Sequence, residues 1–159
     1  MPTHDHLLRD TLIPFLRGQG AHADLNAAVE DFPAEHYGTR PHGLPHSAWE
    51  LLEHIRFTLH DLINFCTNPE YTEPEWPADY WPKNPAPQHP EDWHRTVTAI
   101  QQDMEEFEKL MSDPRSNLYS KIPWGDGQTL LREVLLAADH TSYHTGQIIL
   151  VRQLLGIWK

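Results

Sequence analysis

His140 and His144 are the residues of this chain best placed to do chemistry. On an α-helix, a spacing of four residues puts both imidazoles on one face, one turn apart, where they can bind the same cation. His144 also falls in an apolar stripe, between Thr141 and Ile148, so we expect it to face a core. No glutamate stands between the two histidines, which excludes the helical metalloprotease motif.

A metal site built on this pair needs a third ligand, and His54 is the best candidate. It lies between Leu51 and Thr58, on the edge of another apolar stripe. That edge faces inward if its helix packs against the helix of the histidine pair. Three buried imidazoles without a metal would leave polar nitrogens unpaired, at a cost of about 1–3 kcal/mol each. This cost favours a ligand, although buried water could also pair the nitrogens, and a histidine on a helix face is often an ordinary packed residue.

Other polar residues near these positions have weaker claims to a role. Asp61 could orient an imidazole as a hydrogen-bond acceptor, but an exposed aspartate is the more ordinary interpretation. Tyr143 and Gln147 are weak candidates for contacts around the site. His60 should point away from His54, because six residues turn a helix to its far side. We interpret the remaining histidines as non-ligating, namely His4, His6, His22, His36, His42, His46, His89 and His94.

Helix signals predict which elements position the three histidines. A first helix is expected to begin after Thr3 as N-cap and to stop at Gly18, with a kink or split at Pro14. A short helical piece over residues 24–31 and a loop over residues 33–45 should follow.

The second long helix has the clearest start, because Ser47 and Glu50 form a capping-box pattern. Its apolar stripe steps by four and three residues until Asn68-Pro69 ends the helix. The members of this stripe are Ala48, Leu52, Ile55, Leu59, Leu62 and Cys66.

Two more helices are expected, one from Pro90 to Pro114 and one from about Gln128 to Leu155. Residues 67–92 show no helical pattern but contain seven prolines and several aromatic residues. We expect them to form an ordered crossover that returns along the bundle and leaves the second and third helices parallel. The sequence therefore predicts one all-α domain over residues 1–159, a four-helix bundle with a long crossover loop between helices two and three.

Composition excludes several classes of function. The net charge of −11, without a basic run, argues against a nucleic-acid partner. No apolar run approaches the roughly 20 residues of a membrane span, and the polar N-terminus does not resemble a signal peptide, so a cytoplasmic location is the default expectation. The single cysteine, Cys66, excludes an internal disulfide and is expected to pack in the core.

Two separated motifs resemble the DinB-like superfamily. The run HSAWELLEHIR at residues 46–56 resembles the second helix of that family, and DHTSYHTGQ at residues 139–147 resembles the fourth. NPEY and PEWP in the crossover and RQLLGIW near the end look like one branch of the family. The resemblance implies a four-helix bundle with a divalent metal ion on one histidine of helix two and two of helix four. The matching positions are His54, His140 and His144.

The resemblance also implies a function. Family members are often homodimers, and some are thiol-dependent transferases or isomerases. The branch tied to ergothioneine-type synthesis has an acidic residue where this chain has Gly146. We therefore expect a metal-dependent transferase or hydrolase that uses a low-molecular-weight thiol or another small molecule, and a homodimer without nucleic-acid or membrane partners. The alternative is a non-catalytic, metal-braced bundle that acts as a binding or stress-related protein.

The sequence leaves the metal and the catalytic residues open. Zinc, nickel and iron all suit imidazole ligands. There is no Gly-rich phosphate loop, Ser-His-Asp arrangement or reactive cysteine motif that would designate catalytic residues. Metal binding should weaken below about pH 6.5, as free imidazoles protonate.

Overall fold

Four long helices carry the fold in the computed structural model, which describes residues 4–158. They are α1 (His4–Leu16), α3 (Ala48–Thr67), α4 (Pro90–Ser112) and α5 (Leu130–Leu154). A short helix, α2 (Leu25–Val29), and two 3₁₀ turns, η1 (Ala34–His36) and η2 (Pro41–Gly43), connect α1 to α3. The described residues contain no strand beyond one isolated bridge between Lys121 and Thr129, so the all-α prediction is confirmed. The expected N-cap Thr3 lies outside the described residues.

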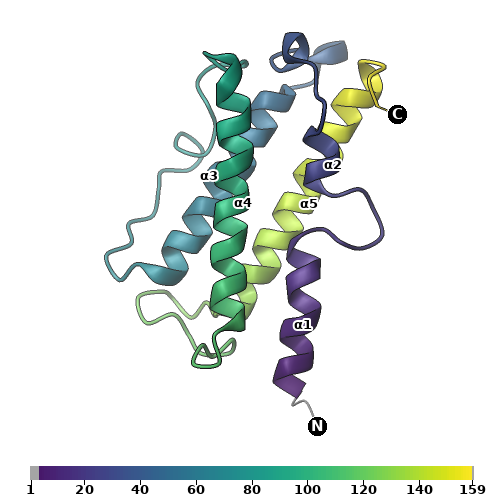
Figure 1. Ribbon diagram of the computed structural model, residues 1–159. Helices are drawn as coiled ribbons and strands as arrows, with labels where there is room; N and C mark the ends of the chain where they lie inside the picture. Colours follow the sequence, from purple (N-terminus) through teal and green to yellow (C-terminus); the bar gives the residue numbers. More distant parts are fainter. Residues whose placement is uncertain (1–3, 159) are drawn as a thin grey trace.

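The segment between α3 and α4 runs back along the bundle (Figure 1). α3 ends at the lower left of the view, the chain returns along the outside to the top, and α4 then descends beside α3. α3 and α4 are therefore parallel, while α1 and α5 run in the opposite direction. α3 packs against both α4 and α5, and α1 packs against the same two helices, which closes the bundle. This is the arrangement expected from the length of the crossover segment.

The predicted apolar stripes form the core. Ile55 and Leu52 on α3, Phe107 on α4 and Val134 and Ile148 on α5 are fully buried. Burying a side chain of this size contributes roughly 1.5–3 kcal/mol to stability. Cys66, the last member of the α3 stripe, is only partly buried, and so are Val97 on α4 and Leu155 after α5. The stripes therefore fix which faces of α3 and α5 meet.

The capping residues that the sequence predicted form the helix ends. The hydroxyl of Ser47 accepts a hydrogen bond from the Glu50 N–H at 3.2 Å, and the Glu50 carboxylate accepts from the Ser47 N–H at 2.8 Å. This capping box fixes the start of α3. Gly18 and Gly156 end α1 and α5 with φ values of 68° and 72°, a left-handed conformation that glycine adopts without strain.

Two boundaries differ from the sequence prediction. α1 continues through Pro14 to Leu16 without the expected split: the proline removes one intrahelical hydrogen bond, and the burial of Leu12 and Leu16 on either side of it offsets that loss. α5 begins at Leu130 rather than near residue 128. Thr129 is its N-cap, since the threonine side chain accepts a hydrogen bond from the N–H of Arg132 at 3.2 Å.

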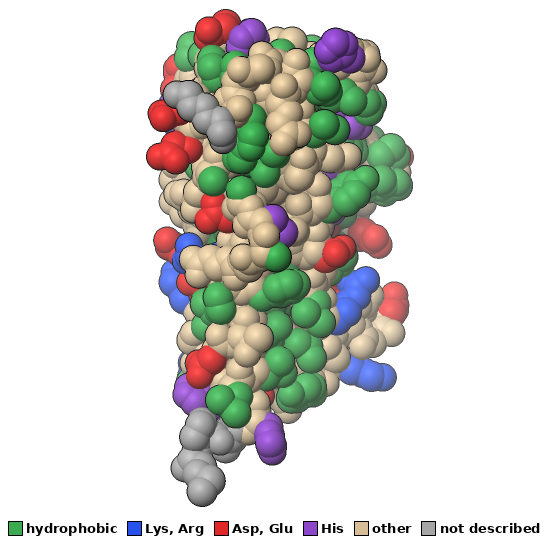
Figure 2. Space-filling model, turned by 90° about the vertical axis from the view of Figure 1, so that its right-hand side faces the viewer, with side chains coloured by type: hydrophobic (Ala, Val, Ile, Leu, Met, Phe, Trp, Pro, Cys, Tyr) green, Lys and Arg blue, Asp and Glu red, His purple; other side chains and the backbone are tan. Residues whose placement is uncertain are grey.

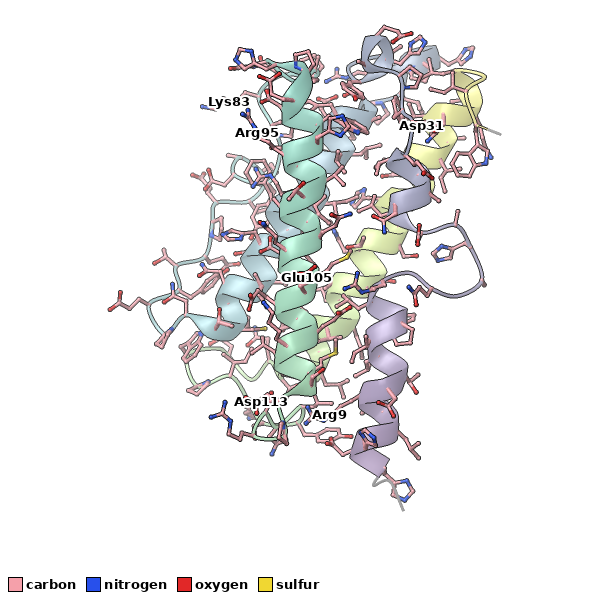
Figure 3. All side chains as sticks on the ribbon, viewed as in Figure 1. Arg9, Asp31, Lys83, Arg95, Glu105 and Asp113 are labelled. Atoms are coloured by element: carbon pink, nitrogen blue, oxygen red, sulfur yellow. The ribbon has the colours of Figure 1, made fainter. Side chains whose placement is uncertain are left out.

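Two buried arginines tie helices together through backbone carbonyls. Arg152 on α5 donates a hydrogen bond of 3.0 Å to the carbonyl of Ala28 at the end of α2. Arg9 on α1 donates to the carbonyls of Met111 and Asp113 at the end of α4, and Figure 3 shows Arg9 and Asp113 at this end of the bundle. A cation at a helix C-terminus pairs with carbonyls that the helix itself leaves free.

The crossover segment is fastened to α3 by its polar side chains. The hydroxyls of Tyr71 and Tyr80 both donate to the carboxylate of Asp61, at 2.8 and 2.7 Å. Near the other end of the segment, the carbonyl of Pro85 accepts a hydrogen bond from the Ser47 hydroxyl at 2.5 Å. These contacts place the segment beside α3 along most of its length.

The surface is acidic, as the composition indicates. Figure 2 shows the side of the molecule that carries α1 and the C-terminus, where Lys and Arg side chains form a few separate groups among scattered Asp and Glu. Of the helices described, none has the length and apolarity that a membrane span requires.

Candidate metal centre

The packing of α3 against α5 brings His54, His140 and His144 together. One ring nitrogen of each histidine lies within 4.8 Å of the corresponding nitrogens of the other two. The Nε2 atoms of His54 and His140 are 3.0 Å apart. His54 and His144 are buried and His140 is half-buried. The structure therefore places all three predicted residues in one cluster.

The orientation of His54 is set by the crossover segment. Its Nδ1 atom lies 2.8 Å from the carbonyl oxygen of Tyr80. A carbonyl can only accept, so Nδ1 carries the hydrogen and Nε2 of the neutral ring keeps a lone pair. Asp61 does not touch His54; it accepts the hydroxyl hydrogen bond of Tyr80 and so holds the residue whose carbonyl orients the imidazole.

The orientation of His144 is set by Gln147. The Nδ1 atom of His144 lies 2.6 Å from the side-chain oxygen of Gln147, which again leaves Nε2 with the lone pair. The amide nitrogen of Gln147 lies 3.5 Å from the hydroxyl of Tyr143, whose ring is 64% exposed. Both weak candidates therefore contact His144: Gln147 through the hydrogen bond to Nδ1, and Tyr143 through an edge-to-face ring contact with centroids 4.9 Å apart.

Aromatic rings cover the cluster on the side of the crossover segment. Trp81 stacks on His54 with ring centroids 3.9 Å apart and an interplanar angle of 7°. Trp81 also stacks on His46, at 4.0 Å. Trp76, which is 66% exposed, lies farther away, with its centroid 6.3 Å from that of His54. Trp81 therefore shields one face of the His54 imidazole from water.

Burial keeps the three imidazoles neutral. It lowers the pKa of His54 to about 4, with further lowering from repulsion by His144 and His46 and an opposing effect of the Tyr80 carbonyl. Burial and repulsion by His144 and His54 lower the pKa of His140 to about 3. Burial also lowers the pKa of His144, against the effect of its hydrogen bond to Gln147. Protons therefore compete with a metal only at a lower pH than the value of about 6.5 expected for free imidazole.

The donor set fits a divalent transition metal. Two nitrogens on one tetrahedral zinc ion, each at about 2.0–2.1 Å, lie about 3.3 Å apart. The 3.0 Å between the Nε2 atoms of His54 and His140 is close to this value. Separations up to 4.8 Å within the cluster mean that ligation of one ion by all three rings draws the rings closer together. Among the described residues the cluster contains no carboxylate or thiolate, so three neutral ligands would leave an ion its full charge and at least one open position.

The remaining titratable candidates lie outside the cluster. His60 is exposed and faces Asp103, with Nδ1 3.4 Å from a carboxylate oxygen, so it points away from His54 as expected. Cys66 is a free thiol, and burial raises its pKa to about 12. A protonated, packed thiol is neither a nucleophile nor a metal ligand at neutral pH.

Sequence reasoning missed three parts of this site. The carbonyl of Tyr80 has no side-chain signal in the sequence. His46 was interpreted as a non-ligating loop residue, and the sequence did not indicate that it stacks on Trp81. Trp81 was expected to lie over the bundle, but nothing in the sequence identified His54 as the ring beneath it.

A comparison with family models assigns the chain to a family. The family model of the DinB superfamily matches residues 19–148, which include α3, the crossover, α4 and the three histidines. The chain therefore belongs to the DinB superfamily, as the motifs of α3 and α5 suggested. Neither the curated proteins nor the solved structures contain a match to it.

Proposed function

We propose that His54, His140 and His144 bind one divalent transition metal ion, and that the protein uses this ion to activate a thiol or water for transfer or hydrolysis. The observation that carries the proposal is the convergence of three neutral imidazoles, two of which donate their Nδ1 hydrogens to fixed acceptors. Such outer partners orient the ligating rings in metal sites. Membership of the DinB superfamily supports the same conclusion.

Each part of the surroundings has a separate role in this proposal. A bound ion supplies Lewis acidity, which lowers the pKa of a thiol or water at an open position. Tyr80 and Gln147 hold the imidazoles of His54 and His144 in the metal-binding tautomer. Trp81 excludes water from one side, and the exposed rings of Trp76 and Tyr143 offer apolar contacts to a small molecule.

Metal-dependent turnover tests the proposed activity. The metal-free protein, the metal-loaded protein and a metal-treated His144→Ala variant are incubated with low-molecular-weight thiols and electrophilic co-substrates, and loss of the free thiol is followed. Turnover should appear only in the metal-loaded wild type. Turnover that survives complete chelation would contradict the proposal.

A non-catalytic role of the metal is the second candidate, and one observation favours it. The side chains nearest the expected ion are poorly accessible, since His54 is 3% and His144 is 8% exposed. An ion that only braces the bundle should raise the melting temperature without admitting a ligand. In the cobalt-substituted protein, a thiol that reaches the ion changes the visible absorption, whereas a closed site leaves the spectrum unchanged.

We also propose a homodimer that uses the outer face of α5. Leu135, Leu150 and Leu154 are exposed apolar residues that lie on one side of this helix. Light scattering after size-exclusion chromatography should give twice the chain mass, and Leu150→Glu should return the protein to a monomer. A wild type that remains a monomer at high concentration would contradict this part of the proposal.

A further inference from the structure

A hollow of about 550 Å³ lies between α3, α4 and the crossover segment, apart from the metal centre. Glu53 and Arg56 line it from α3. Glu53 is adjacent to His54 in the sequence, but consecutive residues point about 100° apart around a helix. None of the three clustered histidines lines the hollow, so it is not part of the site described above.

Cationic side chains gather at this hollow in an otherwise acidic protein. Arg56, Lys83 and Arg95 line it, three of the 12 Lys and Arg in a chain whose net charge is −11. They come from three different segments: α3, the crossover and α4. Figure 3 shows Lys83 and Arg95 near each other beside the first turns of α4.

The two carboxylates that line the hollow, Glu53 and Asp92, do not neutralise its three cations. Glu53 accepts from two nitrogens of Arg56, at 2.8 and 2.9 Å, and from the hydroxyl of Thr96 at 2.6 Å. Asp92 is paired with one nitrogen of Arg95 and accepts the backbone N–H of His89.

Among the described cations of the hollow, Lys83 is the one without a carboxylate partner. Its ammonium group makes no hydrogen bond or ion pair with the described residues. With three cations and two carboxylates, the lining has an excess of one positive charge. Arg95 keeps further guanidinium donors beyond the nitrogen that pairs with Asp92.

The rest of the lining suits an organic molecule rather than a bare ion. Asn84 and Gln88 add amide donors, and an apolar surface is formed by Trp49, Pro82, Ala86 and Ala99. A volume of about 550 Å³ lies within the range of roughly 300–1,000 Å³ typical of small-molecule sites. Apolar walls with a few charged donors are the usual composition of such sites.

We propose that this hollow is a second ligand site that binds a small organic anion. Its carboxylate or phosphate group pairs with Lys83 and Arg95, and its apolar part lies against Trp49. Arginine binds both anionic groups through two parallel hydrogen bonds, and lysine binds them as a point charge. The site requires no metal, so this proposal is independent of the metal centre.

Calorimetric titration of the full-length protein with benzoate, phenyl phosphate and neutral benzyl alcohol tests the proposal. At least one anion should bind saturably in the millimolar range or tighter, and benzyl alcohol about 10-fold or more weakly. Comparison of the two anions shows whether a carboxylate or a phosphate is preferred. Lys83→Ala and Arg95→Ala should each weaken anion binding about 10-fold, the loss of one charge-assisted hydrogen bond.

Lys109→Ala is the matched control, because Lys109 is an exposed lysine of α4 that pairs with Glu106 away from the hollow. It should leave the affinity unchanged. Lys83 is exposed, so its replacement should not disturb folding, and circular dichroism checks this. The proposal is overturned if neither anion binds, if benzyl alcohol binds as well as the anions, or if Lys83→Ala and Arg95→Ala both bind as the wild type does.

Discussion

The Nδ1 atom of His54 lies 2.8 Å from the carbonyl oxygen of Tyr80, 26 residues farther along the chain. The hydroxyl of the same tyrosine donates to Asp61, two turns after His54 on α3. Asp61 of α3 thus holds the crossover segment through Tyr80, and the carbonyl of Tyr80 in turn orients His54 of α3. The crossover is therefore part of the metal centre, beyond its role of connecting α3 to α4.

Removal of the Tyr80 hydroxyl should weaken metal binding without unfolding the protein. Tyr80→Phe frees the segment from Asp61 and loosens the carbonyl that holds His54. We expect affinity to fall about 5- to 10-fold, at or below the lower end of the range for outer partners of metal ligands. Tyr71→Phe is the control, since Tyr71 donates to the same carboxylate but presents no acceptor to a cluster histidine. Equal affinities of the two variants in competition with a chelator dye would refute the role of Tyr80.

Gln147 offers a test in which two substitutions have opposite effects. Gln147→Leu removes the acceptor of the His144 Nδ1 hydrogen and should lower metal affinity about 10-fold or more. Gln147→Glu keeps an acceptor and makes it negative, so His144 becomes a stronger donor to the metal and affinity should equal or exceed that of the wild type. If both variants bind metal with wild-type affinity, Gln147 does not position His144.

The metal-free protein should lose stability as the pH falls from about 6.5 to about 4. In the unfolded chain the cluster histidines have the ordinary pKa of about 6.5, whereas burial lowers the folded-state values to about 4 for His54 and about 3 for His140. Between these values the unfolded state binds more protons, so the free energy of unfolding decreases with decreasing pH. Above about pH 6.5 both states are neutral at these sites and the effect vanishes.

Urea titrations of the metal-free protein across this pH range measure the slope. His140→Phe should make the slope shallower, because one group with a lowered folded-state pKa is gone. A His140→Phe slope as steep as that of the wild type would contradict the assignment of the pH dependence to the cluster.

Cys66 should take no part in metal binding. Burial raises its pKa to about 12, so the thiol is protonated at pH 8 and should react with iodoacetamide far more slowly in the folded than in the unfolded protein. Cys66→Ala should retain a full metal content, with a modest loss of stability of about 1 kcal/mol from the smaller side chain. Loss of metal in this variant would place a sulfur ligand in the site.

The sequence predicted those parts of the molecule that depend on local pattern. Ser47 and Glu50 marked the start of α3, and the apolar stripes marked the buried faces of the long helices. Because helical spacing places His140 beside His144, the pair on α5 was readable from residues alone. His54 needed one further inference, that α3 packs against α5, and the resemblance to the DinB superfamily supplied it.

The parts that escaped prediction depend on tertiary placement. The acceptor for His54 is a backbone carbonyl, which every residue has, so no residue type marks Tyr80 for this role. Lys83 lies between prolines in a segment without periodicity, and only the folded path of that segment brings it to Arg95. Pro14 was expected to kink or split α1, but Leu16 beyond it is buried in the core, and that burial depends on tertiary packing.

Metal content tests the central claim most directly. Protein produced without an affinity tag is analysed for transition metals as the wild type and as His54→Ala, His140→Ala, His144→Ala and the control His60→Ala. The wild type and the control should each contain one ion per chain, and each cluster variant should lose it. A wild type that neither carries nor takes up a metal, or a His54→Ala variant that keeps the full content, would show that α3 and α5 do not share a metal centre.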